Sequence, residues 1–224
     1  MRDKILRIYP DMDPESPREW DNLGTIFMTG MEKYSFNETS GGGDWLGFIE
    51  HEITGIRAYA DIEDKMSALF DRDEGEYWQV IERLFDEFFV WLPLYYNGHK
   101  LYFRNEEEGM IFIARTDLEK EKLSEKRALE VFKAEIETLN QYLTGEVYGY
   151  ELVDTDDAEI GDHIDSCWGF YGEDIYTNGI TDHVNMAEVK RIEYMTPCTI
   201  HSYEAIHTEE LENDNKDQMV ERCA

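Results

Sequence analysis

Positive charge is scarce in this sequence. Its 224 residues include 21 Lys and Arg against 51 Asp and Glu, which gives a formal net charge of -30. Proteins that bind nucleic acid through its phosphates need clustered cations to displace counterions, and anionic bilayers attract polybasic segments. The composition therefore excludes direct nucleic-acid binding through phosphate contacts and argues against docking on an anionic membrane.

Cysteine and long apolar runs are also in short supply. The three cysteines, Cys167, Cys198 and Cys223, show no metal-ligand spacing and cannot all pair, so we expect neither a disulfide framework nor a cysteine zinc site. No run of about 18 apolar residues occurs, and the N-terminus lacks the apolar segment of a secretory signal. These features predict a soluble cytoplasmic protein with reduced thiols.

Enough apolar residues are present for a folded core, at 42% of the sequence. Apolar side chains recur at helical spacing from Tyr77 to Leu92, and we expect Pro93 to end that helix. A shorter helix is predicted over 62–70. Ser124 is a candidate cap of a long helix that Gly145 closes.

Strand patterns separate these helices. Asn97-Gly98 between two aromatic-rich segments predicts a two-residue hairpin, and 110–114 and 147–153 are further strand candidates. Because no βαβ rhythm appears, the predicted class is α+β, an antiparallel sheet with packed amphipathic helices. We expect one domain over 1–203, with an insertion at 40–75, and a mobile acidic tail over 204–224.

Three passages carry a resemblance to a known family: SPREWDNLGT at 16–25, QYLTGEVYGY at 141–150 and DSCWGFYG at 165–172. Together they are similar to small uncharacterised proteins encoded by phages, prophages and plasmids, over about residues 4 to 175. The resemblance implies an accessory protein of a mobile element working in the cytoplasm of a bacterial host. It carries no catalytic residue over. Within the first passage we expect Trp20 in the core, with Asp21 and Asn22 anchoring a turn.

Several patterns invite a metal or catalytic interpretation. The acidic run 154–162 offers oxygen ligands for calcium, but Ala158 and Glu159 break the EF-hand pattern, which favours a solvated loop. His51, His163 and His183 have acidic neighbours without the spacing of a zinc enzyme.

Two further patterns have simpler interpretations. Cys167 could act as a nucleophile, but its apolar and aromatic neighbours favour a buried small hydrophobe. The glycines at 41–43 lack the spacing and the Lys of a phosphate loop. We predict no catalytic residue, no metal and no cofactor.

The distribution of charge provides the functional hypothesis. Between residues 134 and 189 the chain carries 14 acidic residues and no Lys or Arg. Such a field would draw the chain to the basic groove of a nucleic-acid-handling protein, where carboxylates replace phosphates as partners of Arg. We therefore predict a phage-type inhibitor of a host defence system, of the anti-CRISPR or anti-restriction type, whose partner is a basic nucleic-acid-binding protein or ribonucleoprotein. The candidate partner-binding residues are Asp154, Asp156, Asp157, Glu159, Asp162, Asp165, Glu173 and Asp174.

Other functions remain open at this point. Clustered acids could hold Mg²⁺ or Mn²⁺ in a hydrolase of a nucleotide signal, although phosphate substrates usually also meet Arg or Lys. The chain could be a non-enzymatic accessory or structural protein of the phage. The negative surface could also serve solubility alone.

Overall fold

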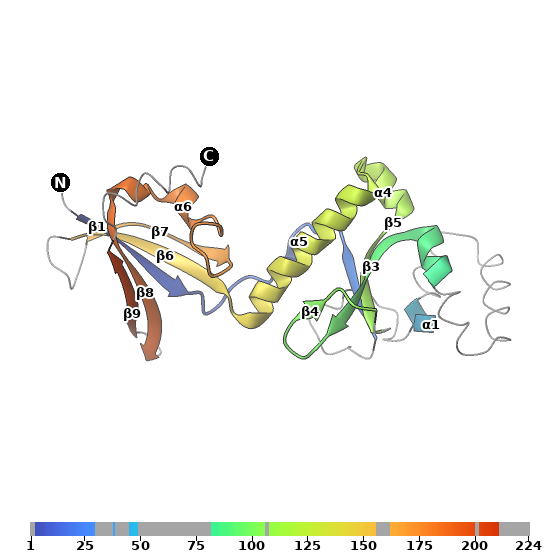
Figure 1. Cartoon of the computed structure of the whole chain (residues 1–224), viewed down its shortest axis with the longest axis horizontal. Coiled ribbons are helices and arrows are strands. Elements are labelled where there is room, and N and C mark those ends of the chain that lie inside the picture. The colour runs from blue at the N-terminus through green and yellow to red at the C-terminus, as the bar shows by residue number, and fades with distance from the viewer. Residues whose placement is uncertain are drawn as a thin grey trace. The chain divides into compact units, whose positions relative to one another are not determined.

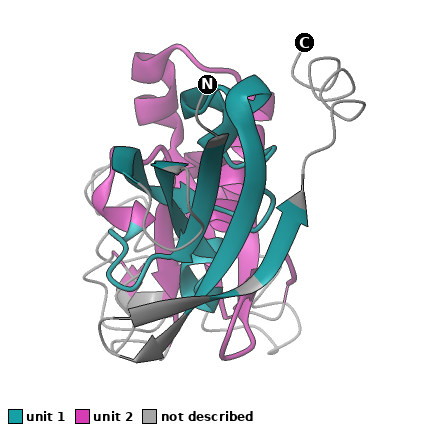
Figure 2. Cartoon of the chain, turned by 90° about the vertical axis from the view of Figure 1, so that its left-hand side faces the viewer, with its two compact units in different colours: residues 1–16, 141–224 teal, residues 17–140 magenta. Residues whose placement is uncertain are grey.

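A computed structural model describes residues 3–29, 38, 45–48, 82–105, 108–155, 162–199 and 202–210. Its mixture of helices and mainly antiparallel strands confirms the predicted α+β class (Figure 1). The chain divides into two compact units, unit 1 (residues 1–16 and 141–224) and unit 2 (residues 17–140), shown in Figure 2. This division differs from the single domain over 1–203 that the sequence suggests.

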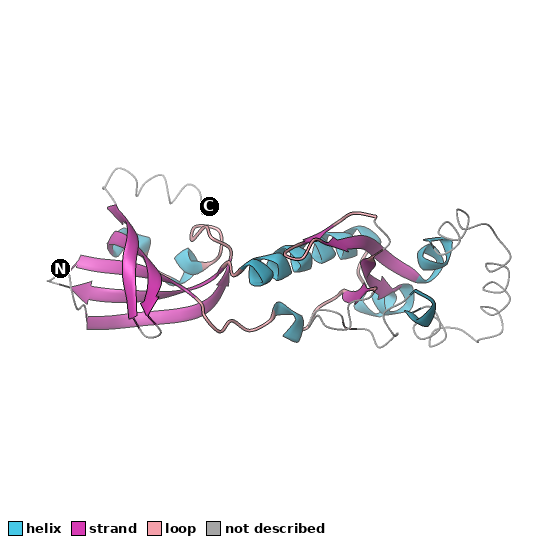
Figure 3. Ribbon diagram, turned by 90° about the horizontal axis from the view of Figure 1, so that it is seen from below, coloured by secondary structure: helices cyan, strands magenta, loops and turns pink. Residues whose placement is uncertain are grey.

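Unit 1 is built on a five-stranded sheet, which Figure 3 shows in magenta together with the strands of unit 2. Its strands are β1 (Asp3–Pro10), β6 (Val147–Thr155), β7 (Asp162–Tyr171), β8 (Val189–Thr199) and β9 (Ser202–Glu210). They lie in the order β7-β6-β1-β8-β9, with β1 and β8 parallel and the other pairs antiparallel. Residues 204–210 therefore belong to a strand, which corrects the predicted start of the tail. Residues 211–224 lie outside the described residues.

The core of unit 1 lies on one face of this sheet. The register sets Leu6 opposite Leu152 and Ile8 opposite Tyr150, and all four side chains are buried. Between β7 and β8, α6 (Ile180–His183) contributes the buried Ile180, and the partly buried Met186 of a short 3₁₀ turn (Met186–Glu188) packs against this core. We call the face of the sheet that carries Leu6, Ile8, Tyr150 and Leu152 the core face. Alternation along the strands fixes which residues share it.

The opposite face of the sheet carries a polar network. Arg7 lies beside Glu151 on β6 and Glu193 on β8, and its Nε donates to the Glu193 carboxylate at 3.0 Å. Arg191 pairs with the same carboxylate at 2.8 Å. Further along, Trp168 packs directly over Gly149, where any Cβ would clash with the indole. The second and third passages of the family resemblance thus meet at this contact.

Unit 2 contains a four-stranded sheet in the order β2-β5-β3-β4. The strands are β2 (Thr25–Met28), β3 (Phe89–Tyr96), β4 (Leu101–Tyr102) and β5 (Gly109–Ala114). Its described helices are α1 (Trp45–Phe48), a helical segment over 82–88, α4 (Arg115–Glu121) and α5 (Glu125–Thr144), whose last four residues fall in unit 1, with a 3₁₀ turn at Pro17–Glu19. An aromatic cluster of Phe27, Phe48, Phe85, Phe89 and Phe112 forms its core. None of the described helices combines the length and the apolar character needed to cross a bilayer.

The chain departs from the predicted long helix at Phe89. Residues 82–88 are helical, but Phe89 begins strand β3, which runs through Pro93 instead of ending there. A continuous apolar run fits either a buried helix or a buried strand, so the pattern alone is ambiguous. At Pro93 the strand pairs only with β5, because β4 reaches no further than Tyr95 and Tyr96. Proline is tolerated where one side of a strand has no neighbour. The predicted helix over 62–70 lies outside the described residues.

Other local predictions are confirmed. The Ser124 hydroxyl accepts a hydrogen bond from the Arg127 amide at 3.2 Å at the start of α5. Gly145 ends the helix with a positive φ of 74°. The hairpin at Asn97 forms, although its loop spans four residues between Tyr96 and Leu101. The Asn97 side chain closes this loop by accepting the amides of His99 and Lys100.

Candidate interaction surface

Of the eight predicted partner-binding acids, five lie in the described part of the chain. Asp154 on β6 faces Asp162 on β7, and Asp165 on β7 faces Leu152. The register therefore places these three carboxylates on the core face of the sheet, near the β7 edge. Asp156, Asp157 and Glu159 lie outside the described residues.

The carboxylates near the β7 edge have different environments. Asp165 is exposed and accepts hydrogen bonds from the Tyr150 hydroxyl at 2.8 Å and from the Ser166 amide at 2.9 Å. Burial, with the Asp165 hydrogen bond adding to it, raises the pKa of Tyr150 to about 12, so this phenol stays a donor. Asp162 is exposed, whereas Asp154 is half-buried and its Oδ1 is enclosed without a hydrogen-bond partner. Asp162 and Asp165 are therefore the more accessible of the three.

Glu173 and Asp174 lie in the turn that follows β7. The Asp174 side chain accepts the Tyr176 amide at 3.0 Å, and its carbonyl accepts the amides of Thr177 and Asn178. This local bonding is typical of aspartate in turns and fixes the backbone without using the second carboxylate oxygen. Both side chains are exposed.

Acidic side chains gather around tyrosines on the core-face side of unit 1. Burial is the main cause that raises the pKa of Tyr148, and the charges of Glu173 and Glu146 add to it. Burial also raises the pKa of Tyr176, helped by Glu209 and Asp174. We call the set Glu146, Tyr148, Glu173, Asp174, Tyr176, Tyr194 and Glu209 the tyrosine–acid surface.

Tyr194 links this surface to the last strand. It lies opposite His207 on β9, with ring centres 5.6 Å apart, and His207 Nε2 lies 3.4 Å from the Glu209 carboxylate. Burial, together with the charges of Glu209 and Asp174, raises the pKa of Tyr194 to about 12. Asp174 in the turn after β7 and Glu209 on β9 therefore both act on Tyr194.

Sequence reasoning missed Glu146 and Glu209. Glu209 falls in the segment assigned to the acidic tail, although the alternation of His207 and Glu209 along a strand could have placed both on one face. Glu146 follows the glycine that closes α5 and precedes β6. Its position beside the turn after β7 depends on a long-range backbone bond, in which the Gly172 amide donates to the Glu146 carbonyl at 2.8 Å.

The described cations of unit 1 are largely engaged with glutamates. Lys4 pairs with Glu188, and Arg7 and Arg191 share Glu193 on the polar face. The sequence of unit 1 contains 24 acidic and 7 basic residues, a net charge of -17 over 100 residues. The acids of the tyrosine–acid surface are therefore not neutralised by a comparable number of local cations.

The described residues show no geometry that supports a metal site or a nucleophile at the candidate histidines and Cys167. Among the described residues, no three His, Cys, Asp or Glu side chains lie close enough to hold a metal ion. His163 Nε2 lies 3.2 Å from the Ser166 hydroxyl, and His183 packs edge-on against Phe170. Cys167 is half-buried and packs against the core of unit 1. His51, the glycines at 41–43 and most of the acidic run 154–162 lie outside the described residues.

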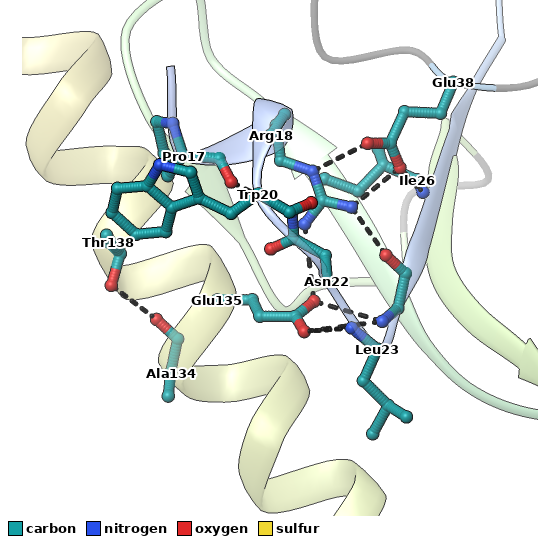
Figure 4. Close-up of polar contacts among 11 residues, drawn as sticks. Pro17, Arg18, Trp20, Asn22, Leu23, Ile26, Glu38, Ala134, Glu135 and Thr138 are labelled. Atoms are coloured by element: carbon teal, nitrogen blue, oxygen red, sulfur yellow. Dashed lines mark hydrogen bonds and ion pairs between the residues drawn. The ribbon is translucent and has the colours of Figure 1, made fainter. Parts of the chain in front are cut away.

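In unit 2, the loop 16–25 places Trp20 differently from the prediction. Trp20 is 45% exposed rather than in the core. The Asn22 amide donates to the carbonyls of Pro17 and Trp20, both at 2.9 Å, so the predicted turn-anchoring role of Asn22 is confirmed (Figure 4). The residue of this loop that lies in the interior is Arg18, whose side chain is only 4% exposed.

Arg18 and Glu135 hold this loop to helix α5. The guanidinium donates to both oxygens of Glu38, at 2.9 and 2.7 Å, to the Gly24 carbonyl at 2.5 Å and to Glu135 at 3.3 Å (Figure 4). Glu135 also accepts the Leu23 amide at 2.6 Å. These carboxylates act as internal acceptors that replace missing backbone partners.

Comparisons with known proteins assign no family. No protein-family model, no curated protein and no solved structure matches this chain.

Proposed function

We propose that this chain is an inhibitor that binds the cationic nucleic-acid groove of a host defence enzyme, using the acids of unit 1 as substitutes for phosphates. The targets in view are CRISPR effector complexes and restriction enzymes. The resemblance of the three sequence passages to phage-encoded proteins supports this biological context. The chemistry of the proposal depends on unit 1 alone.

One observation carries the proposal: the Asp174 carboxylate binds the Tyr176 amide, and Glu209 lies beside His207, which faces Tyr194, while Arg7 and Arg191 pair with Glu193 on the other face. An arginine-rich groove would meet carboxylates that accept bidentate hydrogen bonds. The tyrosine rings add apolar contact area and faces for cation–π contacts. Tyrosine phenols are neutral donors at physiological pH, and burial raises the pKa values of Tyr176 and Tyr194 further.

The β7 acids extend the proposed surface. Asp162 and Asp165 are exposed and lie on the core-face side of the sheet at its edge. With Glu173 and Asp174 they form a series of carboxylates along one strand and its following turn. Neighbouring acids repel one another, and a basic partner would relieve this repulsion on binding.

A cleavage assay tests the proposal. The chain is added to purified restriction endonucleases of different types and to CRISPR effector–guide RNA complexes, and cleavage of target DNA is measured. A four-site variant, D162N/D165N/E173Q/D174N, removes negative charge from unit 1. The matched control, D117N/E119Q/E121Q/E137Q, removes the same charge from exposed positions of α4 and α5 in unit 2.

We expect the wild-type chain to inhibit at least one of these enzymes. The four-site variant should need at least about tenfold more protein for half-inhibition, because several charge-assisted contacts are lost together. The control should stay within about twofold of wild type. Inhibition that falls equally in both variants would show that net charge, and not the surface of unit 1, is responsible. Lack of inhibition across the panel would contradict the proposal.

A further inference from the structure

A groove of about 230 Å³ lies beside Trp20 in unit 2. One wall is the loop of Pro17, Trp20 and Asn22. The other wall is one face of α5, where the lining residues follow helical spacing at 127, 130, 131, 134 and 138. Figure 4 shows the indole of Trp20 beside the α5 segment that carries Ala134 and Thr138. The groove is thus framed by an aromatic ring on one side and a helix face on the other.

The loop that carries Trp20 is held in place from beneath. Arg18, almost fully buried, binds Glu38, Glu135 and the Gly24 carbonyl, and Asn22 ties the loop to the carbonyl of Pro17. Trp20 on this loop remains 45% exposed. Because the hydrogen bonds of the loop fix its backbone, the indole is pre-organised for contact with a partner. Exposed tryptophans beside pockets are frequent energetic centres of protein interfaces.

The charges at the groove favour a cation. Glu130 and Glu135 both line it, opposed by Arg127. Arg127 is paired with Glu130 at 3.1 Å, but the two side chains are 63% and 49% exposed, so the pair is weak and exchangeable. When Arg18 and Glu38, which hold the Trp20 loop in place, are counted as well, three carboxylates stand against two guanidinium groups. A cationic side chain of a partner can pair with Glu130 in place of Arg127, while its apolar stem packs on Trp20 and Val131.

We propose that the groove binds one Arg or Lys side chain of a basic partner protein. Its volume is smaller than the about 300 to 1,000 Å³ typical of small-molecule pockets and suits a single long side chain. The inference rests on the proposed function, because that function is the reason to expect a positively charged partner protein. It adds a second contact, in unit 2, that the acids of unit 1 do not provide.

The test uses small blocked amino acids and no partner enzyme. N-acetyl-arginine amide, its neutral isostere N-acetyl-citrulline amide and the apolar N-acetyl-leucine amide are titrated into the full chain. The indole N–H resonances are followed by NMR, with Trp20 assigned from its absence in Trp20→Phe. Glu130→Gln removes the exchangeable carboxylate, and Glu137→Gln is the matched control, an exposed acid of α5 outside the groove.

We expect a saturable shift of the Trp20 resonance with the arginine compound and about fivefold weaker binding of citrulline. Glu130→Gln should weaken arginine binding about threefold, whereas Glu137→Gln should leave it unchanged. Equal binding of arginine and citrulline, tighter binding of leucine, or no saturable shift would overturn the proposal. Equal losses in both glutamate variants would assign the effect to overall charge.

The two proposals can fail separately. This titration involves neither nucleic acid nor a nuclease, so its failure leaves the inhibition assay as it stands. Loss of inhibition in the four-site variant would likewise say nothing about Trp20.

Discussion

The two units use their carboxylates in different ways. In unit 2, Glu135 and Glu38 accept hydrogen bonds from the buried Arg18 and from backbone amides, so their charge is satisfied inside the fold. In unit 1, burial raises the pKa values of Tyr148 and Tyr176, and the charges of nearby carboxylates such as Glu173 and Glu209 add to this effect. Net charge alone therefore does not identify an interaction surface. What distinguishes the two cases is the surroundings of the carboxylates: Glu135 and Glu38 bind a guanidinium that is only 4% exposed, whereas the Glu209 carboxylate, beside His207, is itself 39% exposed.

The largest expected effect comes from removing the cation of unit 2. Arg18→Met leaves Glu135 and Glu38 without their guanidinium partner, and breaking a buried pair in this way typically costs about 3–5 kcal/mol. Urea denaturation followed by tryptophan fluorescence measures the loss, since four of the five tryptophans belong to unit 2.

The matched control is Arg127→Met on the exposed face of α5, where the pair with Glu130 is worth about 0–1 kcal/mol. Similar losses in the two variants would contradict the internal role of Arg18.

Two glycines sharpen the comparison at the level of packing. A Cβ on Gly24 would meet Ile111 and Phe132, which lie in the packed interior of unit 2. Gly24→Ala should therefore destabilise by about 1–3 kcal/mol, as overpacking does. A Cβ on Gly149 would meet Trp168, which is 49% exposed and can move outward, so we expect a cost under about 1 kcal/mol.

Thermal or urea denaturation of both alanine variants checks their order. A larger loss for Gly149→Ala would mean that the Trp168 contact is a structural centre of unit 1.

Alkaline pH should affect unit 1 through its tyrosines. Tyr9, Tyr150, Tyr171 and Tyr194 all have pKa values raised to about 12 from 10.0, mainly by burial. Because the unfolded chain ionises first, their protonated form stabilises the fold fully below pH 10. This contribution is lost as the pH rises toward 12.

Absorbance of tyrosinate and denaturation midpoints against pH measure the effect. Tyr194→Phe should flatten the alkaline decline. An unchanged profile in this variant would show that Tyr194 ionises equally in the folded and unfolded chains.

The smallest expected effect is the stability change of the four-site variant of unit 1. Removing four exposed acids relieves repulsion, and the side-chain oxygen of Asn can still accept the Tyr150 hydroxyl at 165 and the Tyr176 amide at 174, so the unfolding free energy should stay within about 0.5 kcal/mol of wild type or rise slightly. Denaturation curves of both charge variants provide the check. A marked loss of stability would show that these carboxylates serve the fold, as Glu135 does in unit 2.

Local patterns predicted much of the fold. Ser124, Gly145 and the Asn97 turn act through neighbouring residues, so their roles follow from sequence spacing. The change from helix to strand at Phe89 does not follow from sequence spacing, because the apolar run suits either a helix or a strand until its partner strand β5 is known. The strand β9 was similarly hidden, since its pairing with β8 outweighs an acidic composition.

The candidate surface was predicted only in part. Glu173 and Asp174 were identified from a cation-free stretch, but Glu146 and Glu209 join them through tertiary contacts that no local pattern records. Trp20 was expected in the core but is exposed, and Arg18 of the same loop is buried instead, for a similar reason. A buried guanidinium needs acceptors, and Glu135, 117 residues away, supplies one of them.

Competition with DNA tests the central claim most directly. Fluorescence anisotropy of a labelled duplex bound to the inhibited enzyme is followed as the chain is added, at several salt concentrations. We expect the chain to displace DNA, its affinity to fall with rising salt, and the four-site variant to show a shallower salt dependence than its unit 2 control. Simultaneous binding of DNA and the chain, or an identical salt dependence in both variants, would contradict the account.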